Sequence, residues 1–405
     1  MGPLSLKTLS PQVKQYLVIT GNYWAFTLTD GALRMLVVLY FHQLGYSPLN
    51  IAMLFLFYEI FGVVTNLVGG WLGARLGLNK TMNIGLALQI IALAMLAVPN
   101  ELLTIVYVMF AQALSGIAKD LNKMSAKSSI KLLVPEGAEG KLYQWVAVLT
   151  GSKNTLKGIG FFLGGVLLTI LGFSGAVTLM SALLAFVWLF SLWMLKEDLG
   201  KAKNKPKFSE IFSKSPPINL LSAARLFLFG ARDVWFVVAL PVFLAASFGW
   251  DHWWVGGFMA SWVIGYGIVQ SFAPYFTGKK QGRVPSGKAA FTWAVYLALI
   301  PILIALALHF DFYIQSTILI GLLIFGAIFA INSSLHSYLI VSYADRDGVS
   351  LDVGFYYMAN AMGRLIGTVL SGWLYQQYGL AACLWVSALF VSTAALISMK
   401  LPRNS

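Results

Sequence analysis

Long apolar segments, broken at short intervals by Gly, Pro or charged residues, run through almost the whole chain. An α-helix needs about 20 consecutive apolar residues to cross a bilayer. Twelve segments of the sequence meet this requirement. They cover residues 16–42, 49–73, 81–98, 102–134, 142–171, 175–195, 218–247, 253–276, 289–308, 313–341, 351–378 and 380–399. The pattern therefore predicts a polytopic membrane protein with twelve transmembrane helices.

The longest polar connection, LKEDLGKAKNKPKFSEIFSKSPP, lies between the sixth and seventh segments. It divides the chain into an N-terminal bundle (1–196), a cytoplasmic linker (197–217) and a C-terminal bundle (218–405). The predicted fold class is all-α, with the twelve helices arranged as two pseudo-symmetric bundles of six.

Lys and Arg concentrate in alternate connections between the segments. Of the 28 basic residues, 19 fall in the tails and in every second connection. These are Lys7, Lys14, Arg75, Lys80, Lys131, Lys141, Lys196, Lys201, Lys203, Lys205, Lys207, Lys214, Lys279, Lys280, Arg283, Lys288, Arg346, Lys400 and Arg403. The remaining connections hold neither Lys nor Arg. Because cytoplasmic loops carry the basic excess, both termini are predicted to be cytoplasmic. The polar start of the chain lacks a cleavable signal peptide, so the first segment is expected to stay in the membrane.

A pair of glycines seven residues apart recurs along the chain. Gly70 and Gly77 end the second segment, Gly165 and Gly172 end the fifth, and Gly372 and Gly379 end the eleventh. The eighth segment, ending APYFTGKKQG, keeps the pattern poorly. A single pair is typical of close helix packing. Its recurrence at three of twelve segments favours nested three-helix repeats of the kind found in secondary transporters.

Composition narrows the function. The chain is 59% hydrophobic and 11% charged, which soluble domains do not show. Its formal charge of +13 is explained mainly by the basic loops, so nucleic-acid binding is not expected. The single cysteine, Cys383, excludes a disulfide framework and a multi-thiolate metal site. We expect no cofactor, no metal and a monomer in the bilayer, with the proton gradient left open as an energy source.

With Lys131 assigned to the inner end of the fourth segment, nine basic residues remain within the predicted spans and form the candidate substrate-binding set: Arg34, Lys119, Lys123, Lys127, Lys153, Lys157, Arg225, Arg232 and Arg364. The acids counted against them, as candidates for ion pairing or coupling, are Asp30, Glu59, Asp120 and Asp233. The excess of positive charge predicts a cavity that concentrates anions. Arg can clamp a phosphate with two parallel hydrogen bonds, whereas Lys acts as a mobile point charge.

Lys119, Lys123 and Lys127 are spaced four apart, so they fall within about 80° of one another on a helix. A charged side chain near the bilayer centre costs about 3 kcal/mol, so this row should face a wet interior. Lys127 either joins the row or snorkels to the inner surface. Lys153 and Lys157 repeat the same spacing on the fifth segment and are expected to face the same way.

Pairing inside the spans stays open at several positions. Asp30 and Arg34, four residues apart, either neutralise each other or bind separate partners. Glu59 either carries a coupled proton or pairs with a buried cation. Arg232 and Asp233 are adjacent, about 100° apart on a helix, which predicts different partners for the two.

The tenth segment carries a polar stripe of Asn332, Ser333, Ser334 and His336. These side chains either line a cavity or hydrogen-bond between helices. On the seventh segment, Trp235 is a candidate cavity wall.

The stretch GGWLGARLGLNK resembles the loop motif between the second and third helices of the major facilitator superfamily, through Gly70, Arg75, Gly77 and Lys80. Ala74 stands where that motif usually has an acidic residue. The resemblance implies a transporter in which helices one, four, seven and ten are central, flanked by two, five, eight and eleven. All thirteen charges counted within the spans fall on segments one, two, four, five, seven or eleven.

Across almost the whole chain the sequence is similar to the ArsJ family of organoarsenical efflux permeases. The similarity is carried by GNYWAFTLTDGALRML (21–36), LFLFYEIFGVVTNLVGGWLGARLGLNKTMNIGL (54–86), GIAKDLNKMSAKSSIKLLVP (116–135), LTGSKNTLKGIGFFLGG (149–165) and SAARLFLFGARDVWFVVALPVFL (222–244). This resemblance implies export of 1-arseno-3-phosphoglycerate across the bacterial inner membrane. It also implies a functional partner, the glyceraldehyde-3-phosphate dehydrogenase that makes this compound from arsenate.

Three functions remain open from the sequence. The first is efflux of an arsenate ester by alternating access, and the second is transport or exchange of ordinary organophosphates or phosphate. The third is a membrane enzyme or sensor that reads an anion, against which we find no nucleophile and base spacing and no metal-ligand cluster. Arsenate esters suit Arg and Lys, whereas trivalent arsenic prefers thiolates, so the single cysteine argues against arsenite as the cargo.

Overall fold

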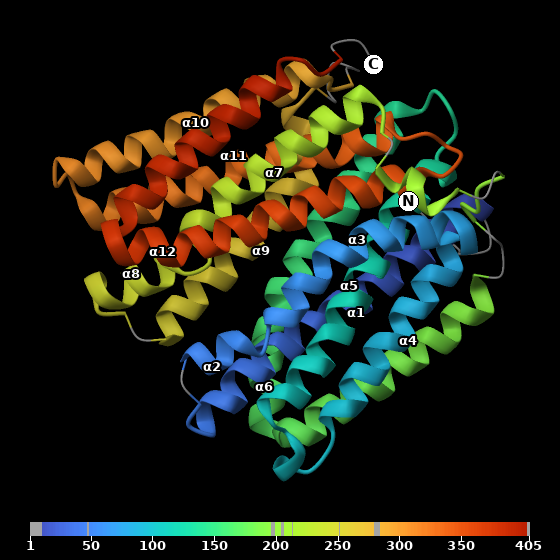
Figure 1. Cartoon of the computed structure of the whole chain (residues 1–405), viewed down its shortest axis with the longest axis horizontal. Coiled ribbons are helices and arrows are strands. Elements are labelled where there is room, and N and C mark those ends of the chain that lie inside the picture. Colours follow the sequence, from blue (N-terminus) through green and yellow to red (C-terminus); the bar gives the residue numbers. More distant parts are fainter. Residues whose placement is uncertain are drawn as a thin grey trace, which may run out of the picture. The chain divides into compact units, whose positions relative to one another are not determined.

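The computed structural model of the chain is all-helical over the residues it describes, which are 10–46, 48–195, 199–203, 206–212, 214–250, 252–278 and 284–402. Figure 1 shows long helices coloured along the chain. Seven basic residues of the predicted inner loops lie outside the described residues: Lys7, Lys196, Lys205, Lys279, Lys280, Arg283 and Arg403.

Contacts divide the chain into two compact units. The first unit comprises residues 1–142, 156–213 and 344–355. Its helices are α1 (Pro11–Gln43), α2 (Pro48–Met53), α3 (Leu56–Leu76), α4 (Leu78–Leu96), the 3₁₀ turn η2 (Asn100–Leu102), α5 (Ile105–Leu133), most of α6 (Glu139–Met194), the 3₁₀ turn η3 (Phe208–Phe212) and the start of α12 (Val349–Ser398). Its apolar core includes the fully buried Leu36, Leu93 and Val108.

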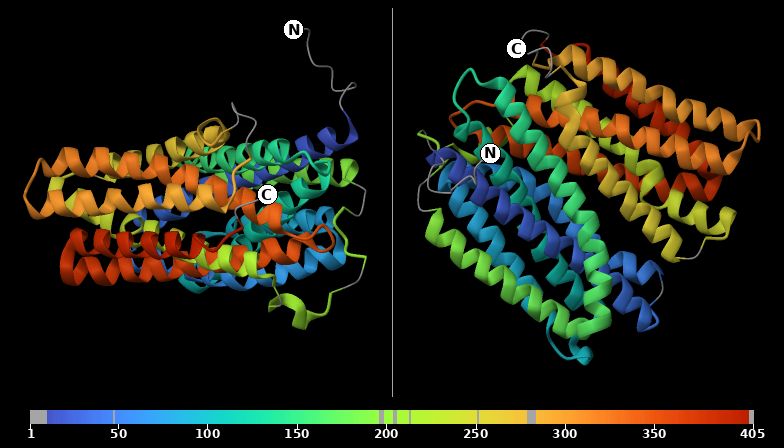
Figure 2. Two further views of the ribbon diagram at one scale, coloured as in Figure 1. Left: turned by 90° about the horizontal axis from the view of Figure 1, so that it is seen from above. Right: turned by 180° about the vertical axis from the view of Figure 1, so that it is seen from behind.

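The second unit comprises residues 143–155, 214–343 and 356–405. Its helices are α7 (Pro216–Phe236), α8 (Ala239–Phe248), α9 (His252–Phe276), α10 (Gly287–His309), α11 (Ile314–Tyr343), the stretch of α6 from Tyr143 to Thr155, and the remainder of α12. α10 and α11 lie side by side in both views of Figure 2. The core of this unit is aromatic, with Trp235, Phe325 and Phe329 fully buried.

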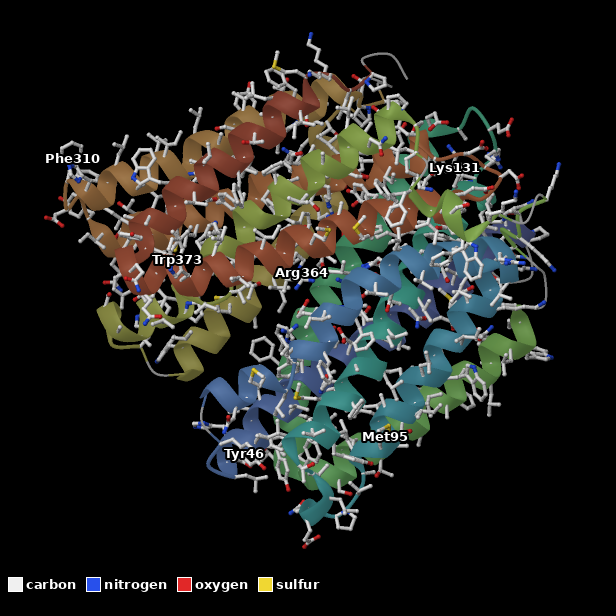
Figure 3. The ribbon with its side chains drawn as sticks, viewed as in Figure 1. Tyr46, Met95, Lys131, Phe310, Arg364 and Trp373 are labelled. Atoms are coloured by element: carbon white, nitrogen blue, oxygen red, sulfur yellow. The ribbon has the colours of Figure 1, made fainter. Side chains whose placement is uncertain are left out.

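Nine helical stretches in the described part of the chain are long and apolar enough to cross a membrane. α6 and α12 each contain two helices joined at a glycine, and the charge-rich α5 is a further helix of spanning length. Together they give the twelve predicted crossings. Large apolar side chains face outward as lipid contact requires; Trp373 of α12, for example, is 55% exposed (Figure 3).

Two of the predicted spans are interrupted. The second is divided between α2 and α3, and the seventh is divided between α7 and α8. At the second break the N–H groups of Val238 and Ala239 both donate to the Ser371 hydroxyl, at 3.3 and 3.0 Å. Ser371 is fully buried on α12. Its oxygen therefore accepts hydrogen bonds from two N–H groups that have lost their partners within the helix. Without such an acceptor, unpaired N–H groups in apolar surroundings would cost free energy.

The second glycine of each recurring pair marks a helix junction. Gly77, Gly172 and Gly379 have φ of 97°, 67° and 77°, with ψ of 151°, 179° and −175°. This extended backbone with positive φ is essentially restricted to glycine. Each of these residues turns the chain from one helix into the next with no intervening loop. At the eighth segment Gly278 also has positive φ, 115°, so this junction keeps more of the repeat than its sequence indicates.

Backbone hydrogen bonds attach the linker to the loop motif between α3 and α4. Leu78 N–H donates to the Leu199 carbonyl at 2.7 Å, and Ala202 N–H donates to the Ala74 carbonyl at 2.8 Å. Ala74 is fully buried. The motif position that lacks an acidic side chain is thus held through its backbone instead.

Side chains reinforce this attachment. The Trp71 indole N–H donates to the Pro206 carbonyl at 3.1 Å, and the Trp71 ring meets the Phe208 ring edge-on at 5.5 Å. The Arg75 guanidinium lies over the same Trp71 ring, with its carbon 5.0 Å from the ring centre. The aromatic contacts fix the linker to the end of α3.

Candidate functional site

In the first unit, Asp120 of α5 binds two lysines of its own helix. Lys123 Nζ lies 2.6 Å from one carboxylate oxygen and Lys119 Nζ lies 3.6 Å from the other. The Asp120 side chain is almost completely buried, and both lysines are mostly buried. Asp120 therefore pairs with two of the three lysines of the predicted row, from within the same helix, and offsets one of their two charges.

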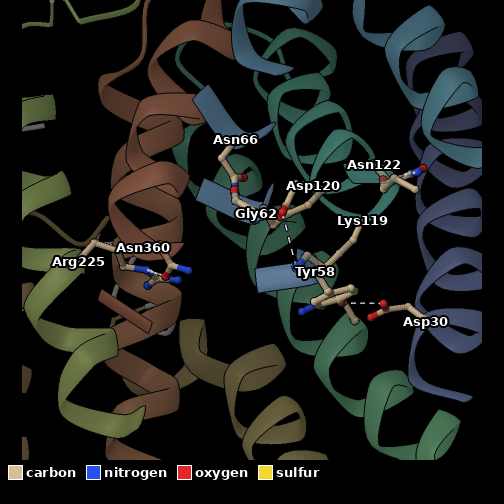
Figure 4. Close-up of polar contacts among 12 residues, drawn as sticks. Asp30, Tyr58, Gly62, Asn66, Lys119, Asp120, Asn122, Arg225 and Asn360 are labelled. Atoms are coloured by element: carbon tan, nitrogen blue, oxygen red, sulfur yellow. Dashed lines mark hydrogen bonds and ion pairs between the residues drawn. The ribbon is translucent and has the colours of Figure 1, made fainter. Parts of the chain in front are cut away.

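Asp30 of α1 is bound by two other helices. Lys157 of α6 lies 3.3 Å from one oxygen, and the Tyr58 hydroxyl of α3 donates to the other at 2.7 Å (Figure 4). Lys119 Nζ sits 3.9 Å from the centre of the Tyr58 ring. Tyr58 thus connects the Asp30 pair to the α5 lysines, with a hydrogen bond at one end and a cation–π contact on its face.

Arg34 pairs with Glu59 of α3 at 3.6 Å and lies over the Phe55 ring at 5.0 Å. Both charged side chains are about one-third exposed, so this pair is wetter than the others. The structure decides between the alternatives for Asp30 and Arg34, because each binds a partner on another helix and they do not neutralise each other.

Lys127 is 3% exposed, so it is buried in α5 rather than extended to a surface. Lys153 and Lys157 bind different groups despite their matching spacing. Lys153 donates to Asn154 at 3.2 Å and belongs to the second unit, whereas Lys157 pairs with Asp30 in the first.

In the second unit, the fully buried Asp233 of α7 binds two arginines. Arg232 Nε lies 2.6 Å from one carboxylate oxygen, and Arg364 Nε of α12 lies 3.2 Å from the other. The prediction that Arg232 and Asp233 bind different partners is wrong. Their backbone positions diverge by about 100°, but the long arginine side chain curls back to its neighbour.

Arg225 of α7 is 3% exposed and is held by neutral groups. Its Nε donates to Asn360 of α12 at 2.8 Å (Figure 4), and its Nη1 donates to the carbonyl and hydroxyl of Ser333 on α11 at 3.2 and 3.1 Å. The guanidinium lies over the Phe229 ring at 3.8 Å. No carboxylate pairs with it among the described residues.

A chain of hydrogen bonds extends from Ser333 to α6. Gln270 of α9 donates to the Ser333 hydroxyl at 3.2 Å and accepts from Asn154 at 2.6 Å. Asn154 in turn accepts from Lys153. Three helices, α6, α9 and α11, therefore contribute neutral polar groups between the two cations Lys153 and Arg225.

The polar stripe of α11 is buried, with Asn332, Ser333, Ser334 and His336 each at most 1% exposed. Of the two alternatives, cavity lining or hydrogen bonding between helices, Ser333 fits the second, because it accepts from Arg225 of α7 and Gln270 of α9. Trp235 does not form a cavity wall, because it lies in the aromatic core against Trp262 and Phe325.

A cavity of about 310 Å³ lies at the end of α5 in the first unit, separate from these buried pairs. Lys131, Glu136 and Arg346 line it, and Arg346 Nε pairs with Glu136 at 3.2 Å. Charges of both signs surround this cavity, so it does not favour an anion.

Asp352, an acid of the eleventh predicted span that was not counted with the others, lies in the first turn of α12 and accepts from Asp345 N–H.

Sequence reasoning did not identify the uncharged residues of the two clusters. Tyr58 and Asn360 were missed because aromatic and amide side chains are common in membrane helices. The available signal was spacing, since Asn360 precedes Arg364 by one helical turn. Among the described residues no group of three or more His, Cys, Asp or Glu side chains could hold a metal ion.

Comparison with known proteins places this arrangement in context. The family model described as Major Facilitator Superfamily matches residues 19–351. No curated protein matches the chain in sequence. Among solved structures, the human organic anion transporter MFSD10 (TETRAN) aligns with a TM-score of 0.75 at 15% identity, over 96% of this chain and 100% of that one.

Two further solved structures show the same fold. A proton:xylose symporter, XylE, aligns with a TM-score of 0.74 at 12% identity over 96% of each chain. A bacterial homologue of the iron transporter ferroportin, in an outward-facing state, aligns with a TM-score of 0.74 at 14% identity, over 97% of this chain and 99% of that one. With the family match over most of its length, the chain belongs to the major facilitator superfamily and is a multi-pass membrane transporter.

Proposed function

We propose that this transporter exports the organic anion 1-arseno-3-phosphoglycerate by alternating access and so confers resistance to arsenate. The proposal rests on two buried carboxylates, each of which is bound by two cationic side chains. Asp120 binds Lys119 and Lys123, and Asp233 binds Arg232 and Arg364. In each group two positive charges meet one negative charge.

Two cations around one carboxylate attract a further anion. A buried ion pair recovers its desolvation cost only when every charge is well compensated. A phosphate or arsenate oxygen can complete the compensation, and its affinity is greatest where water is excluded. A cationic cargo would meet net repulsion at both groups, which argues against export of apolar cations.

Resemblance to the ArsJ family supports the identity of the cargo. The segments that carry this resemblance contain Asp30, Lys119, Lys157 and Asp233, all of which take part in the buried pairs. They also contain Glu59, which pairs with Arg34 in a wetter position. Cys383 is fully buried on α12, in the apolar core, so it is not placed to bind trivalent arsenic. The proposal includes the inner membrane of a bacterium, cytoplasmic termini, a monomer, and a glyceraldehyde-3-phosphate dehydrogenase as the source of the cargo.

A second candidate is a transporter or exchanger of ordinary organophosphates or inorganic phosphate. The same charge groups favour it, because phosphate and arsenate esters have the same shape and charge. The similarity in fold to an organic anion transporter fits both candidates equally.

Uptake into everted membrane vesicles separates the two candidates. The dehydrogenase, its aldehyde substrate, NAD and arsenate are added outside the vesicles to form the arsenate ester, and trapped arsenic is measured. We expect arsenic uptake to exceed uptake of phosphate or 3-phosphoglycerate. If export runs on the proton gradient, a protonophore should stop it. Equal uptake of phosphate would contradict the proposed cargo.

Substitutions connect this activity to the cluster. Lys119→Gln and Lys123→Gln should each abolish arsenate resistance while the protein remains inserted in the membrane. Lys141→Gln removes the same charge from an exposed position and should retain resistance. Full resistance in both cluster variants would exclude these lysines from the site.

A further inference from the structure

Arg225 differs from six other cations of the membrane-spanning helices in how its charge is compensated. Arg34, Lys119, Lys123, Lys157, Arg232 and Arg364 each lie within 4 Å of a carboxylate oxygen. Arg225 is more deeply buried than these, yet among the described residues it contacts only an amide, a serine and aromatic rings. A buried charge without a counter-ion costs several kcal/mol, so its presence indicates a site whose counter-ion is a ligand.

Neighbouring helices hold the Arg225 guanidinium in one orientation. Asn360 binds Nε, Ser333 binds Nη1, and the Phe229 ring covers one face. Nη2 makes no hydrogen bond to the described residues. A guanidinium fixed on three sides loses little entropy when it binds an anion on the fourth.

Buried polar groups lie beside this guanidinium. Tyr356 of α12 has its ring 5.2 Å from the guanidinium carbon, and its hydroxyl faces the Ser337 hydroxyl of α11. On α11, His336 Nδ1 lies one turn beyond Ser333 and has no hydrogen-bond partner among the described residues. Buried polar atoms are nearly always hydrogen-bonded, so an unpaired nitrogen near a charge without a counter-ion indicates a bound group.

The chemistry of these groups selects the ligand. Arg225 repels cations, and a neutral sugar would leave its charge uncompensated. An oxyanion accepts from the guanidinium and from the Tyr356 and Ser337 hydroxyls together. We propose that Arg225, with Tyr356, Ser337 and His336, forms the site that binds one anionic oxygen group of the cargo. This inference rests on the proposed transport of an organic anion and names where its charge is held.

Binding of simple oxyanions to the purified full-length protein tests the site. Inorganic phosphate, 3-phosphoglycerate and sulfate are titrated, and affinity is obtained from the rise in unfolding temperature, since a ligand that binds the folded state stabilises it. We expect Arg225→Gln to weaken binding by about a hundredfold, and Tyr356→Phe by roughly tenfold, because hydrogen bonds to a charged group are strong.

Matched controls accompany both variants. Lys288→Gln removes a charge, and Tyr296→Phe removes a hydroxyl, at exposed positions of α10, and both should bind as the unmodified protein does. Tyr356→Phe keeps the charge and loses one oxygen atom, so it still tests the site if Arg225→Gln fails to fold.

Two results would overturn the inference: no oxyanion binding by the unmodified protein, or unchanged affinity in Tyr356→Phe together with any folded Arg225→Gln. The proposed cargo is tested separately. If oxyanion binding depends on Arg225 but vesicles do not accumulate the arsenate ester, the site stands and the cargo is wrong.

Discussion

Asp233 is one carboxylate between two guanidinium groups, and its side chain is completely buried. Its two oxygens are divided between Arg232 on its own helix and Arg364 on α12. Removing the one carboxylate leaves two arginines without a counter-charge, whereas removing one arginine leaves an intact ion pair. The three residues should therefore contribute unequally to stability.

Asp233→Asn should therefore destabilise the protein more than Arg364→Gln does. The amide leaves two arginines without a counter-charge, at a cost of about 3–5 kcal/mol. Arg364→Gln leaves Asp233 paired with Arg232 and removes a side chain that is partly exposed. The measurement is the temperature at which each purified variant loses its monodisperse peak in detergent.

Glu210→Gln supplies the control for this comparison, because Glu210 is an exposed acid of η3. Its unfolding temperature should match that of the unmodified protein. An Asp233→Asn variant as stable as Glu210→Gln would show that the triad contributes nothing to stability.

At the scale of helices, hydrophobic length predicted the crossings to within a few residues of the observed bounds. The prediction succeeds because the bilayer sets the same length requirement on every span. It failed at the breaks near Val238 and between α2 and α3, since a helix can be interrupted in a membrane wherever another helix satisfies its backbone. Ser371 performs that role from a position more than a hundred residues away in sequence, which no local pattern reveals.

The two glycines of the last pair should respond oppositely to alanine. Gly379 has φ of 77° and ψ of −175°, which an alanine reaches only at a cost of about 1–3 kcal/mol. Gly372 lies within the helix with open space around it, so alanine there should be neutral or stabilise by up to about 1 kcal/mol. Added Cβ atoms meet nothing within 4 Å at either position, so the difference isolates backbone conformation.

Unfolding temperatures of Gly379→Ala and Gly372→Ala, measured side by side, check this expectation. Equal temperatures would mean that the chain at residue 379 does not need the conformation that only glycine adopts easily. The same comparison applies at Gly172, whose backbone angles are similar.

For the whole molecule, the sequence predicted which residues carry charge into the membrane but not how they pair. Arg34 and Glu59 belong to different helices, and nothing in their spacing links them. Pairing depends on which faces of neighbouring helices meet, and this is set by packing over the whole bundle. The neutral residues around Arg225 were beyond sequence reasoning for the same reason, because their significance comes only from the charge beside them.

The predicted orientation can be tested with single cysteines. In a Cys383→Ala background, Glu101→Cys should react with a membrane-impermeant maleimide in intact cells, because the connection at residue 101 is predicted to lie outside. Lys288→Cys should react only after the membrane is permeabilised. The native side chains at both positions are exposed, so burial in the protein does not prevent labelling. Whether each cysteine reacts therefore depends on which side of the membrane it faces.

The unmodified protein is the control, since Cys383 is fully buried and should not react. Labelling of Lys288→Cys in intact cells would reverse the predicted topology.

Gly172 and Gly379 also bear on how the chain enters the bilayer during synthesis. Each joins two apolar helices without a loop, and no charged residue lies within several positions of either junction. Moving charged groups through the hydrocarbon layer is the expensive step in threading a loop across it. A hairpin with an uncharged, one-residue turn avoids that step, so we expect the paired helices of α6, and those of α12, to enter the membrane together as hairpins while the chain is being made.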